Sequence, residues 1–398
     1  MGASPLPVLW ICGPAGSGKT TAAWQLFTEL TEAGVRAAFA DTDQLGMCPS
    51  ALPGDFEGAR IKAQNLGSMI PNYRAAGVQC LIANGVIDPV AGVPVELLPD
   101  AAVTTCRLRA EPDEVVRRFT ERNGPSDDVL QDIRDEAAAL EQSTFADACV
   151  ETTRVRAHEV AGLIRAACSS WPGFSGELAA ADFPAIEAAA ASGVRTRADG
   201  QVMLICGPAG VGKSTVGFQL FVSCLNAGLA ASYVDLDQIG FVRPPHPGDA
   251  DSHRLKARNL AAIWQNYQGA GATHLIATGP VNNATALQAY TAEIPVALSL
   301  CRLRAGTDEL TKRILSRGAG GSWPQPGDPL RGQPRQVLLE SVARAAEQAQ
   351  ALDTAQFGGL VIDTDGRLPD EAAALIGLRA GWLSPDEGES AKPRGLTG

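Results

Sequence analysis

One short pattern, which occurs twice, constrains this chain of 398 residues most. Residues 13–20 and 207–214 both fit the phosphate-binding pattern Gly-x-x-x-x-Gly-Lys-[Ser/Thr] in full. An apolar run precedes each copy, at 8–12 and 202–206, and a helical pattern follows it. A strand, a glycine-rich loop and a helix in that order surround phosphate oxygens with backbone N–H groups and a helix N-terminus. A glycine-rich turn without a ligand is the alternative, and two complete copies disfavour it.

The pattern assigns a role to particular residues of each loop. Lys19 and Lys213 are expected to reach the β- and γ-phosphates, and the hydroxyls of Thr20 and Ser214 are expected to bind Mg²⁺. The residues expected to contact the nucleotide are Gly13, Gly16, Ser17, Gly18, Lys19, Thr20 and Thr21 in the first copy and Gly207, Gly210, Val211, Gly212, Lys213, Ser214 and Thr215 in the second. On their own, the loops are compatible with ATP or GTP.

Charge and hydropathy exclude some classes of protein. The formal net charge is −11 and the pI is near 5.0, which argues against non-specific nucleic-acid binding because that needs a basic surface. No apolar run is long enough to span a membrane, and the first residues do not have the pattern of a signal peptide. We therefore expect a soluble, cytoplasmic protein without a membrane partner.

The similarity between the two parts of the chain extends well beyond the loops. A shift of 194 positions aligns residues 11–30 with 205–224, and an acid pair, a basic helix and an arginine helix also recur. This predicts a tandem duplication of a whole domain, in which the second copy carries an insert at about 318–335. The expected organisation is a first domain at 1–170, a linker at 171–199, a second domain at 200–382 and a disordered tail at 383–398.

Apolar strands alternate with amphipathic helices in each copy, which is typical of a parallel sheet covered by helices on both faces. The fold class is therefore α/β, with five strands in each copy. The expected strands are 7–12, 35–40, 78–83, 102–108 and 147–151 in the first copy and 201–206, 229–234, 272–277, 295–303 and 358–363 in the second.

An acid pair follows the second strand of each copy. The pairs are Asp41 with Asp43 and Asp235 with Asp237. Ligands bind open α/β sheets at the carboxyl ends of the strands, where such carboxylates can hold Mg²⁺ through water or accept a proton from a substrate hydroxyl. The alternative is a turn-forming Asp at a strand end.

The third strand of each copy ends without an acid, at Asn84 and at Thr278. The acid that motor proteins and GTPases usually carry there is missing, which disfavours both of those classes. The Asp-x-Asp pairs are therefore the best candidates for metal-side carboxylates.

Basic residues follow the acid pairs on the next helix. Arg60 and Lys62, and likewise Arg254 and Lys256, are expected to bind an anionic group of an acceptor molecule. The alternative is a solvated polar face. A later helix carries arginines four residues apart, which suggests a lid over a transferring phosphate; these are Arg118, Arg122, Arg313 and Arg317.

Taken together, these motifs resemble the small P-loop kinases, in particular gluconate kinase-like, adenylylsulfate kinase-like and chloramphenicol phosphotransferase-like proteins. The resemblance covers about 6–168 and 200–380. It implies two P-loop NTPase domains with sheet order 2-3-1-4-5 and a small lid, Mg-ATP as phosphoryl donor, and a small acceptor. It also implies that Asp43 and Asp237 face acceptor and metal, and that adenine lies against 152–154 and 364–367.

The leading hypothesis is a kinase that transfers the γ-phosphate of ATP to a small, anionic metabolite or nucleotide. The alternative is an ATP-binding or ATP-hydrolysing regulatory protein without an acceptor; a kinase acting on a nucleic-acid end is disfavoured by the charge. The expected catalytic residues are Lys19, Asp43, Arg122, Lys213, Asp237 and Arg317, and the expected substrate-binding residues are Asp41, Arg60, Lys62, Asp235, Arg254 and Lys256. The second half is expected to carry more of the turnover. The sequence leaves open whether the halves pack as a pseudo-dimer.

Overall fold

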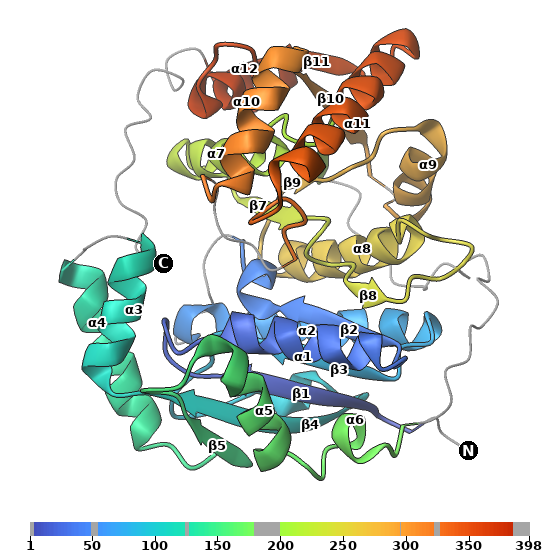
Figure 1. Ribbon diagram of the computed structural model, residues 1–398. Coiled ribbons are helices and arrows are strands. Elements are labelled where there is room, and N and C mark those ends of the chain that lie inside the picture. The colour runs from blue at the N-terminus through green and yellow to red at the C-terminus, as the bar shows by residue number, and fades with distance from the viewer. Residues whose placement is uncertain are drawn as a thin grey trace.

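The chain forms two parallel sheets, one in each half, covered by helices. The structure is a computed structural model that describes residues 4–48, 55–123, 127–178, 200–294, 296–321 and 327–384. Figure 1 shows the first half, in blue to green, beneath the second half, in yellow to red. Of the helices in these residues, none has the length and apolar character needed to cross a membrane.

The parallel strands of both sheets have the order 2-3-1-4-5 that the resemblance implies. The first sheet has the order β5-β4-β1-β3-β2, and the second has the order β11-β10-β6-β9-β7. The strands are β1 (Leu6–Cys12), β2 (Ala37–Asp41), β3 (Cys80–Asn84), β4 (Ala101–Arg109), β5 (Ala148–Glu151), β6 (Gln201–Cys206), β7 (Ala231–Asp235), β9 (His274–Thr278), β10 (Leu298–Arg304) and β11 (Leu360–Asp363). Each begins and ends close to the range expected from its apolar run.

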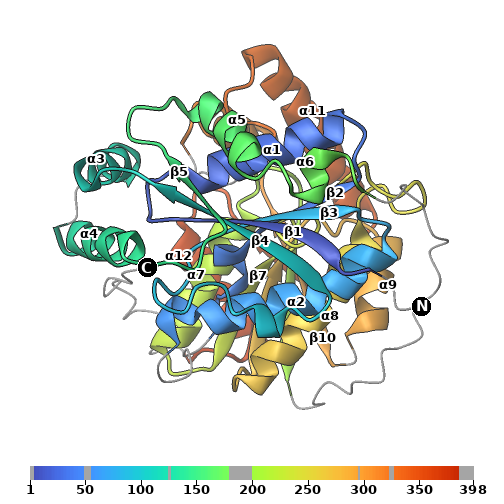
Figure 2. The same ribbon diagram turned by 90° about the horizontal axis from the view of Figure 1, so that it is seen from below.

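Helices cover both faces of each sheet. In the first half α1 and α5 lie on one face and α2 lies on the other (Figure 2). The α-helices are α1 (Lys19–Glu32), α2 (Ala59–Ala75), α3 (Pro112–Asn123), α4 (Asp127–Glu141), α5 (Ala157–Ala167), α6 (Pro172–Ser175), α7 (Lys213–Asn226), α8 (His253–Gly269), α9 (Ala284–Glu293), α10 (Thr307–Gly318), α11 (Arg335–Thr354) and α12 (Pro369–Ala380). The described residues also contain the short 3₁₀ helices η1 (Thr42–Leu45), η2 (Phe56–Gly58) and η3 (Val95–Leu97).

A further strand that the sequence did not predict joins the first sheet from the second half. Strand β8 (Val242–Arg243) pairs antiparallel with β2, and the N–H of Phe39 donates to the carbonyl of Phe241 at 3.0 Å. The reciprocal contact covers the second sheet, because the N–H of Tyr233 on β7 donates to the carbonyl of Met47 at 2.9 Å. Each half therefore covers the edge strand of the other.

Helices α2 and α8 lie side by side between the two sheets (Figures 1 and 2). Their apolar faces belong to one continuous core that contains Trp10 and Leu66 of the first half and Leu204 and Leu260 of the second. Apolar burial is the main favourable contribution to folding, so a shared core makes the stability of each half depend on the other.

The first half extends beyond the boundary expected at residue 170. Trp171 is 1% exposed and packs in the core of the first half, with Phe174 of α6 against its ring. Leu383, expected in the tail, is buried in the core of the second half. The remainder of the expected linker at 179–199, the tail at 385–398 and part of the insert at 322–326 lie outside the described residues.

Candidate functional site

The two glycine loops have the backbone geometry that a phosphate loop requires. Gly13 has φ of 144°, and a Cβ atom there would lie 2.4 Å from the carbonyl oxygen of Leu108. Gly207 has φ of 138°, and its Cβ would lie 2.6 Å from the oxygen of Leu303. Only glycine adopts this backbone conformation without strain, so both loops depend on it.

The lysine of each loop folds back over the loop itself. The Lys19 ammonium donates to the carbonyl of Gly13 at 2.6 Å, and the Lys213 ammonium donates to that of Gly207 at 3.0 Å. Burial lowers the pKa of Lys213 below its ordinary value, and the nearby carboxylates of Asp237 and Asp235 oppose this effect. Each loop therefore carries a cation where nucleotide phosphates are expected.

In the second half, one carboxylate of the acid pair contacts the loop hydroxyl directly. Ser214 Oγ donates to Asp235 Oδ2 at 2.6 Å, and the backbone N–H of Asp237 donates to Asp235 Oδ1 at 3.0 Å. Burial, and next the charge of Asp237, raise the pKa of Asp235. Asp235 and Ser214 thus form one small oxygen site beside the loop.

This oxygen site fits Mg²⁺. Among the described residues, no group of three or more His, Cys, Asp and Glu side chains could hold a metal ion by itself. Magnesium in nucleotide sites commonly binds one or two carboxylates and completes its coordination with phosphates and water. Ser214 and Asp235 would therefore suffice to hold the ion together with a nucleotide.

The first half differs at the same place because Asn84 stands where the second half has Thr278. Asn84 is buried, and its amide donates to Thr20 Oγ1 at 3.0 Å and also hydrogen-bonds Asp41. Burial, and next the charge of Asp43, raise the pKa of Asp41 to about 7. In the first half the Asn84 amide thus bridges Thr20 and Asp41, whereas their counterparts Ser214 and Asp235 are in direct contact in the second half.

The outer acid of each pair binds a lysine from the following helix. Lys62 Nζ lies 3.0 Å from Asp43 Oδ1, and Lys256 Nζ lies 2.9 Å from Asp237 Oδ1. Both lysine side chains are 10% exposed, whereas those of Asp43 and Asp237 are 37% and 52% exposed. Each lysine therefore pairs with a carboxylate that remains partly exposed to solvent.

The two acids of each pair consequently have different proton affinities. Removal from solvent raises the pKa of Asp43 and Asp237, but Lys62 and Lys256 outweigh this, so both pKa values lie below the usual range. The inner acids have raised pKa values, as described above. Paired carboxyl groups whose environments separate their pKa values are typical of sites with divided chemical roles.

The predicted arginines of the basic helices lie farther from this arrangement than the lysines do. Arg60 Nη1 pairs with Glu96 Oε1 at 2.9 Å, and its side chain is 52% exposed. Arg254 is exposed at the corresponding position of α8. The structure therefore brings Lys62 and Lys256 to the acid pairs, while Arg60 pairs on the surface.

The arginine helices hold the glycine loop to the loop after the last strand. Arg313 donates to the carbonyl of Val211 and to Thr364 Oγ1, both at 2.9 Å, and Arg118 makes the equivalent contact with Thr152. The sequence singled out these arginines as part of a lid but did not predict these partners. Such contacts fix one loop relative to the other.

Of the two arginines predicted to be catalytic, one is placed by the structure. Arg317 Nε donates to Asp328 Oδ2 at 2.8 Å, and its charge also contributes to the low pKa of Asp237. Arg317 thus lies close enough to Asp237 for their charges to interact. Arg122 falls in α3, but its side chain lies outside the described residues.

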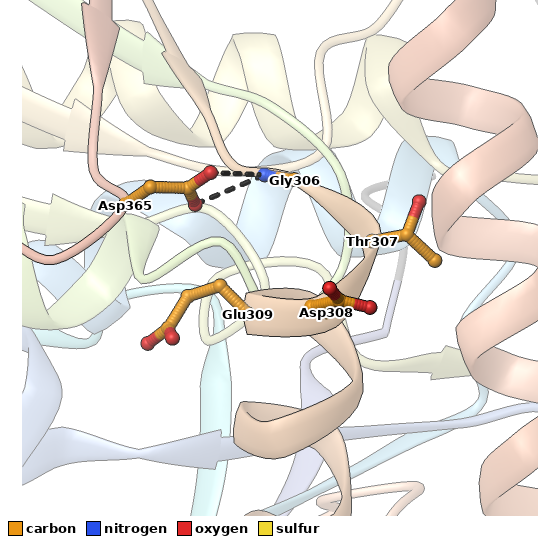
Figure 3. A pocket seen from close by; sticks show the side chains of 5 residues that line it. All are labelled: Gly306, Thr307, Asp308, Glu309 and Asp365. Atoms are coloured by element: carbon orange, nitrogen blue, oxygen red, sulfur yellow. Dashed lines mark hydrogen bonds between the residues drawn. The ribbon is translucent and has the colours of Figure 1, made fainter.

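A depression of about 380 Å³ lies where α10 begins, beside the loop after β11 (Figure 3). It is lined by residues 306–309 and by Asp365, whose two carboxylate oxygens both accept from the Gly306 N–H at 2.9 Å. The loop that the resemblance assigns to adenine is therefore tied to the N-terminal end of the arginine helix.

The carboxyl group of Glu136 contacts the first glycine loop. The N–H of Ala15 donates to Glu136 Oε2 at 3.4 Å, while Glu136 Oε1 is buried and has no hydrogen-bond partner. Burial raises the pKa of Glu136, and Lys19 opposes this effect. No sequence signal identified Glu136, because it belongs to a helix more than one hundred residues after the loop and the corresponding helix of the second half follows an insert.

Replacing Glu136 with Gln is expected to strengthen nucleotide binding by the first half roughly tenfold. The change keeps the shape but removes a carboxylate that would repel the phosphates, and about 1.4 kcal/mol corresponds to that factor. Titration calorimetry with a non-hydrolysable ATP analogue, in a Lys213→Ala background, measures it. Asp135→Asn, at an exposed acid of the same helix, is the matched control. An affinity unchanged by Glu136→Gln would contradict the interpretation.

Known proteins resemble parts of this chain in structure. No protein-family model and no curated protein matches it. Similar solved structures include a tunicamycin resistance protein from Deinococcus radiodurans (17% identity, 46% of this chain, 96% of that chain, TM-score 0.31). Others are a sugar kinase from Janibacter (20%, 44%, 99%, TM-score 0.33) and the APS kinase of Mycobacterium tuberculosis (17%, 46%, 99%, TM-score 0.29). The site residues described above, and not these distant similarities, support the function proposed next.

Proposed function

We propose that the protein transfers the γ-phosphate of ATP, in the presence of Mg²⁺, to a small acceptor that carries a hydroxyl and a negative charge. The observation that supports this most is the acid pair beside each glycine loop. In the second half, Asp235 contacts the loop hydroxyl of Ser214, and the neighbouring Asp237 is ionised, half exposed and held by Lys256.

The glycine loop and its neighbours would bind the donor. Backbone N–H groups of 207–214 and the ammonium of Lys213 offer positive charge to the β- and γ-phosphates. Ser214 and Asp235 would hold Mg²⁺, which when bound neutralises charge on the β- and γ-phosphates. Arg313 donates to both this loop and Thr364. It would therefore fix the loop that binds phosphate relative to the loop assigned to adenine.

Asp237 would orient the acceptor. Its exposed carboxylate accepts a hydrogen bond from the acceptor hydroxyl and takes up that proton. A new bond forms between the γ-phosphorus and the acceptor oxygen as the bond to the β-phosphate oxygen breaks, which releases ADP. Because phosphoryl transfer passes through a loose transition state, positioning and charge contribute more than base strength, so the low pKa of Asp237 is compatible with this role.

Lys256 would contribute to the choice of acceptor. An ammonium group has three donors, so Lys256 can hold Asp237 and an anionic group of the acceptor at the same time. Lys62 has the same relation to Asp43 in the first half. We propose Arg60 and Arg254 as outer contacts to the same anionic group.

The alternative function is an ATP-binding regulatory protein that hydrolyses ATP slowly and has no acceptor. The contact of Glu136 with the first glycine loop favours such a role for the first half. Both halves nevertheless keep the acid and lysine on the acceptor side, which a protein without an acceptor would not need.

Incubation with γ-labelled ATP, Mg²⁺ and a metabolite extract separates the two functions. We expect label in a small molecule with the wild-type chain and none with the Lys19→Ala/Lys213→Ala double variant. Asp237→Asn should reduce the transfer while leaving nucleotide binding nearly unchanged. Release of free phosphate alone, whatever extract is added, would support the regulatory alternative and reject the proposed transfer.

A further inference from the structure

A buried asparagine supports the acid loop of each half. In the second half, Asn259 is fully buried, and its Nδ2 donates to the carbonyl of Ile239 at 2.7 Å. Ile239 lies two residues after Asp237, in the same turn. In the first half, Asn65 is equally buried and donates to the carbonyl of Leu45 at 2.6 Å, two residues after Asp43.

Each of these asparagines is held in turn by the opposite half. Asn72 on α2 donates to Asn259 Oδ1 at 2.9 Å, and Asn266 on α8 donates to Asn65 Oδ1 at 2.9 Å. The two chains of hydrogen bonds correspond in position and run in opposite directions across the contact between α2 and α8, and Asn266 also donates to Ser68 Oγ at 3.0 Å. Tyr267 of the second half adds a hydrogen bond to the carbonyl of Leu45 at 2.8 Å.

The donor from the opposite half stabilises one orientation of the buried amide. An asparagine amide has an accepting side and a donating side, and it can rotate to exchange them. Because the carbonyl of Ile239 can only accept, the NH₂ group of Asn259 faces it, and the donor from Asn72 then satisfies the amide oxygen on the other side. A buried carbonyl without a donor is unfavourable, so this orientation stabilises the turn that carries Asp237.

The acid loops also continue into the opposite sheet. Beyond Leu45, the carbonyl of Met47 accepts from the N–H of Tyr233 on β7. The hydroxyl of Tyr233 lies 3.0 Å from Thr278 Oγ1 and 3.4 Å from the carbonyl of Ser214, inside the second site. The segment that starts at the acids of the first half thus ends against β7, whose Tyr233 contacts Ser214 of the second half.

We propose that each half positions the acid loop of the other: Asn72 is a positioning residue for Asp235 and Asp237, and Asn266 is a positioning residue for Asp41 and Asp43. Neither asparagine touches the reacting groups. Each acts through one buried amide on a turn that holds the metal-side and acceptor-side carboxylates. The turnover readout rests on the proposed function, whereas the magnesium readout does not.

The test crosses two variants with two backgrounds in the full chain. Lys19→Ala leaves the second half competent, and Lys213→Ala leaves only the lower turnover of the first half. In the Lys19→Ala background, Asn72→Ala is expected to lower phosphate transfer or ATP hydrolysis about tenfold, because it removes one hydrogen bond from a buried network. Asn266→Ala should leave that activity within about twofold. In the Lys213→Ala background, Asn266→Ala should lower the activity about tenfold and Asn72→Ala should leave it within about twofold.

A second readout does not require turnover. The Mg²⁺ concentration at half-saturation, measured by calorimetry with a non-hydrolysable ATP analogue, should rise severalfold for the half that has lost its positioning residue. Asn72→Gln keeps an amide donor and should recover part of the second-half activity. If the wild type shows no transfer or hydrolysis, the proposed function fails, and the magnesium readout alone decides this inference.

The pattern of effects separates positioning from general destabilisation. Opposite effects of the two asparagine variants in the two backgrounds would support the proposal. Equal losses in both halves would show that the asparagines only stabilise the fold, and no change in turnover and in magnesium dependence would show that the contact has no influence on the sites. Either result overturns the proposal.

Discussion

Replacing Lys213 with alanine is expected to lower phosphoryl transfer by roughly a hundred- to a thousand-fold, because it removes a preorganised charge from the transferring group. Replacing Lys19 should leave a large fraction of the activity. The two lysines have the same contacts with their own loops, so the difference has to come from their surroundings.

Those surroundings favour the second half. Ser214 contacts Asp235 directly there, whereas Asn84 joins Thr20 and Asp41 in the first half. The first glycine loop also has the Glu136 carboxyl against its Ala15 N–H, where it would compete with a phosphate for that donor. In the second half, Arg317 is held by Asp328, and its charge acts on Asp237.

Measured kcat and KM of the two single variants, with the acceptor found in the labelling experiment, test this expectation. Lys312→Ala is the matched control, because Lys312 is an exposed lysine of α10 that pairs with Glu309. Equal losses in Lys19→Ala and Lys213→Ala would indicate equivalent halves. A larger loss in Lys19→Ala would reverse the assignment.

The second large effect concerns the first half alone. Residues 4–178, expressed without the rest of the chain, are expected not to form a stable monomer. Strand β2 would lose its pairing with β8, and an uncovered edge strand promotes association with other chains. Trp24 would lose Phe241 at a ring-centroid distance of 5.1 Å and the guanidinium of Arg243 at 5.2 Å.

Size-exclusion chromatography and thermal unfolding of the separated half, compared with the full chain, measure this effect. The matched control is a full chain with a protease site inserted within 179–199. After cleavage its two fragments should elute together, because the shared core and the reciprocal edge contacts remain. A separated half that is monomeric and unfolds as cooperatively as the full chain would show that the halves are independent.

The features that could be predicted from the sequence are those that depend on residues close together in the chain. The glycine loops, the ten parallel strands and the acid pairs depend on short patterns, and the structure has these elements close to their expected positions. Lys62 and Lys256 were singled out from their place on a helix after the acids, and both are at the acid pairs. Their roles toward an acceptor remain predictions.

Contacts between distant segments could not be predicted in the same way. Strand β8 has two residues and pairs with a strand about two hundred residues earlier, so it has no periodic pattern of its own. Asn72 and Asn266 read equally well as part of a solvated helix face until α2 and α8 are seen together. The contact of Glu136 with the first glycine loop likewise could not be predicted, because nothing in its local sequence indicates that the loop is nearby.

The reciprocal covering of β2 and β7 also limits assembly. An edge that accepts a neighbour can in principle accept another copy of the same chain, and a contact that does not close on itself builds an open filament. Here the two equivalent contacts, Phe39 with Phe241 and Tyr233 with Met47, satisfy each other within one molecule. The two halves of one chain thereby occupy part of each other's edge strand, which leaves these edges less available to another copy.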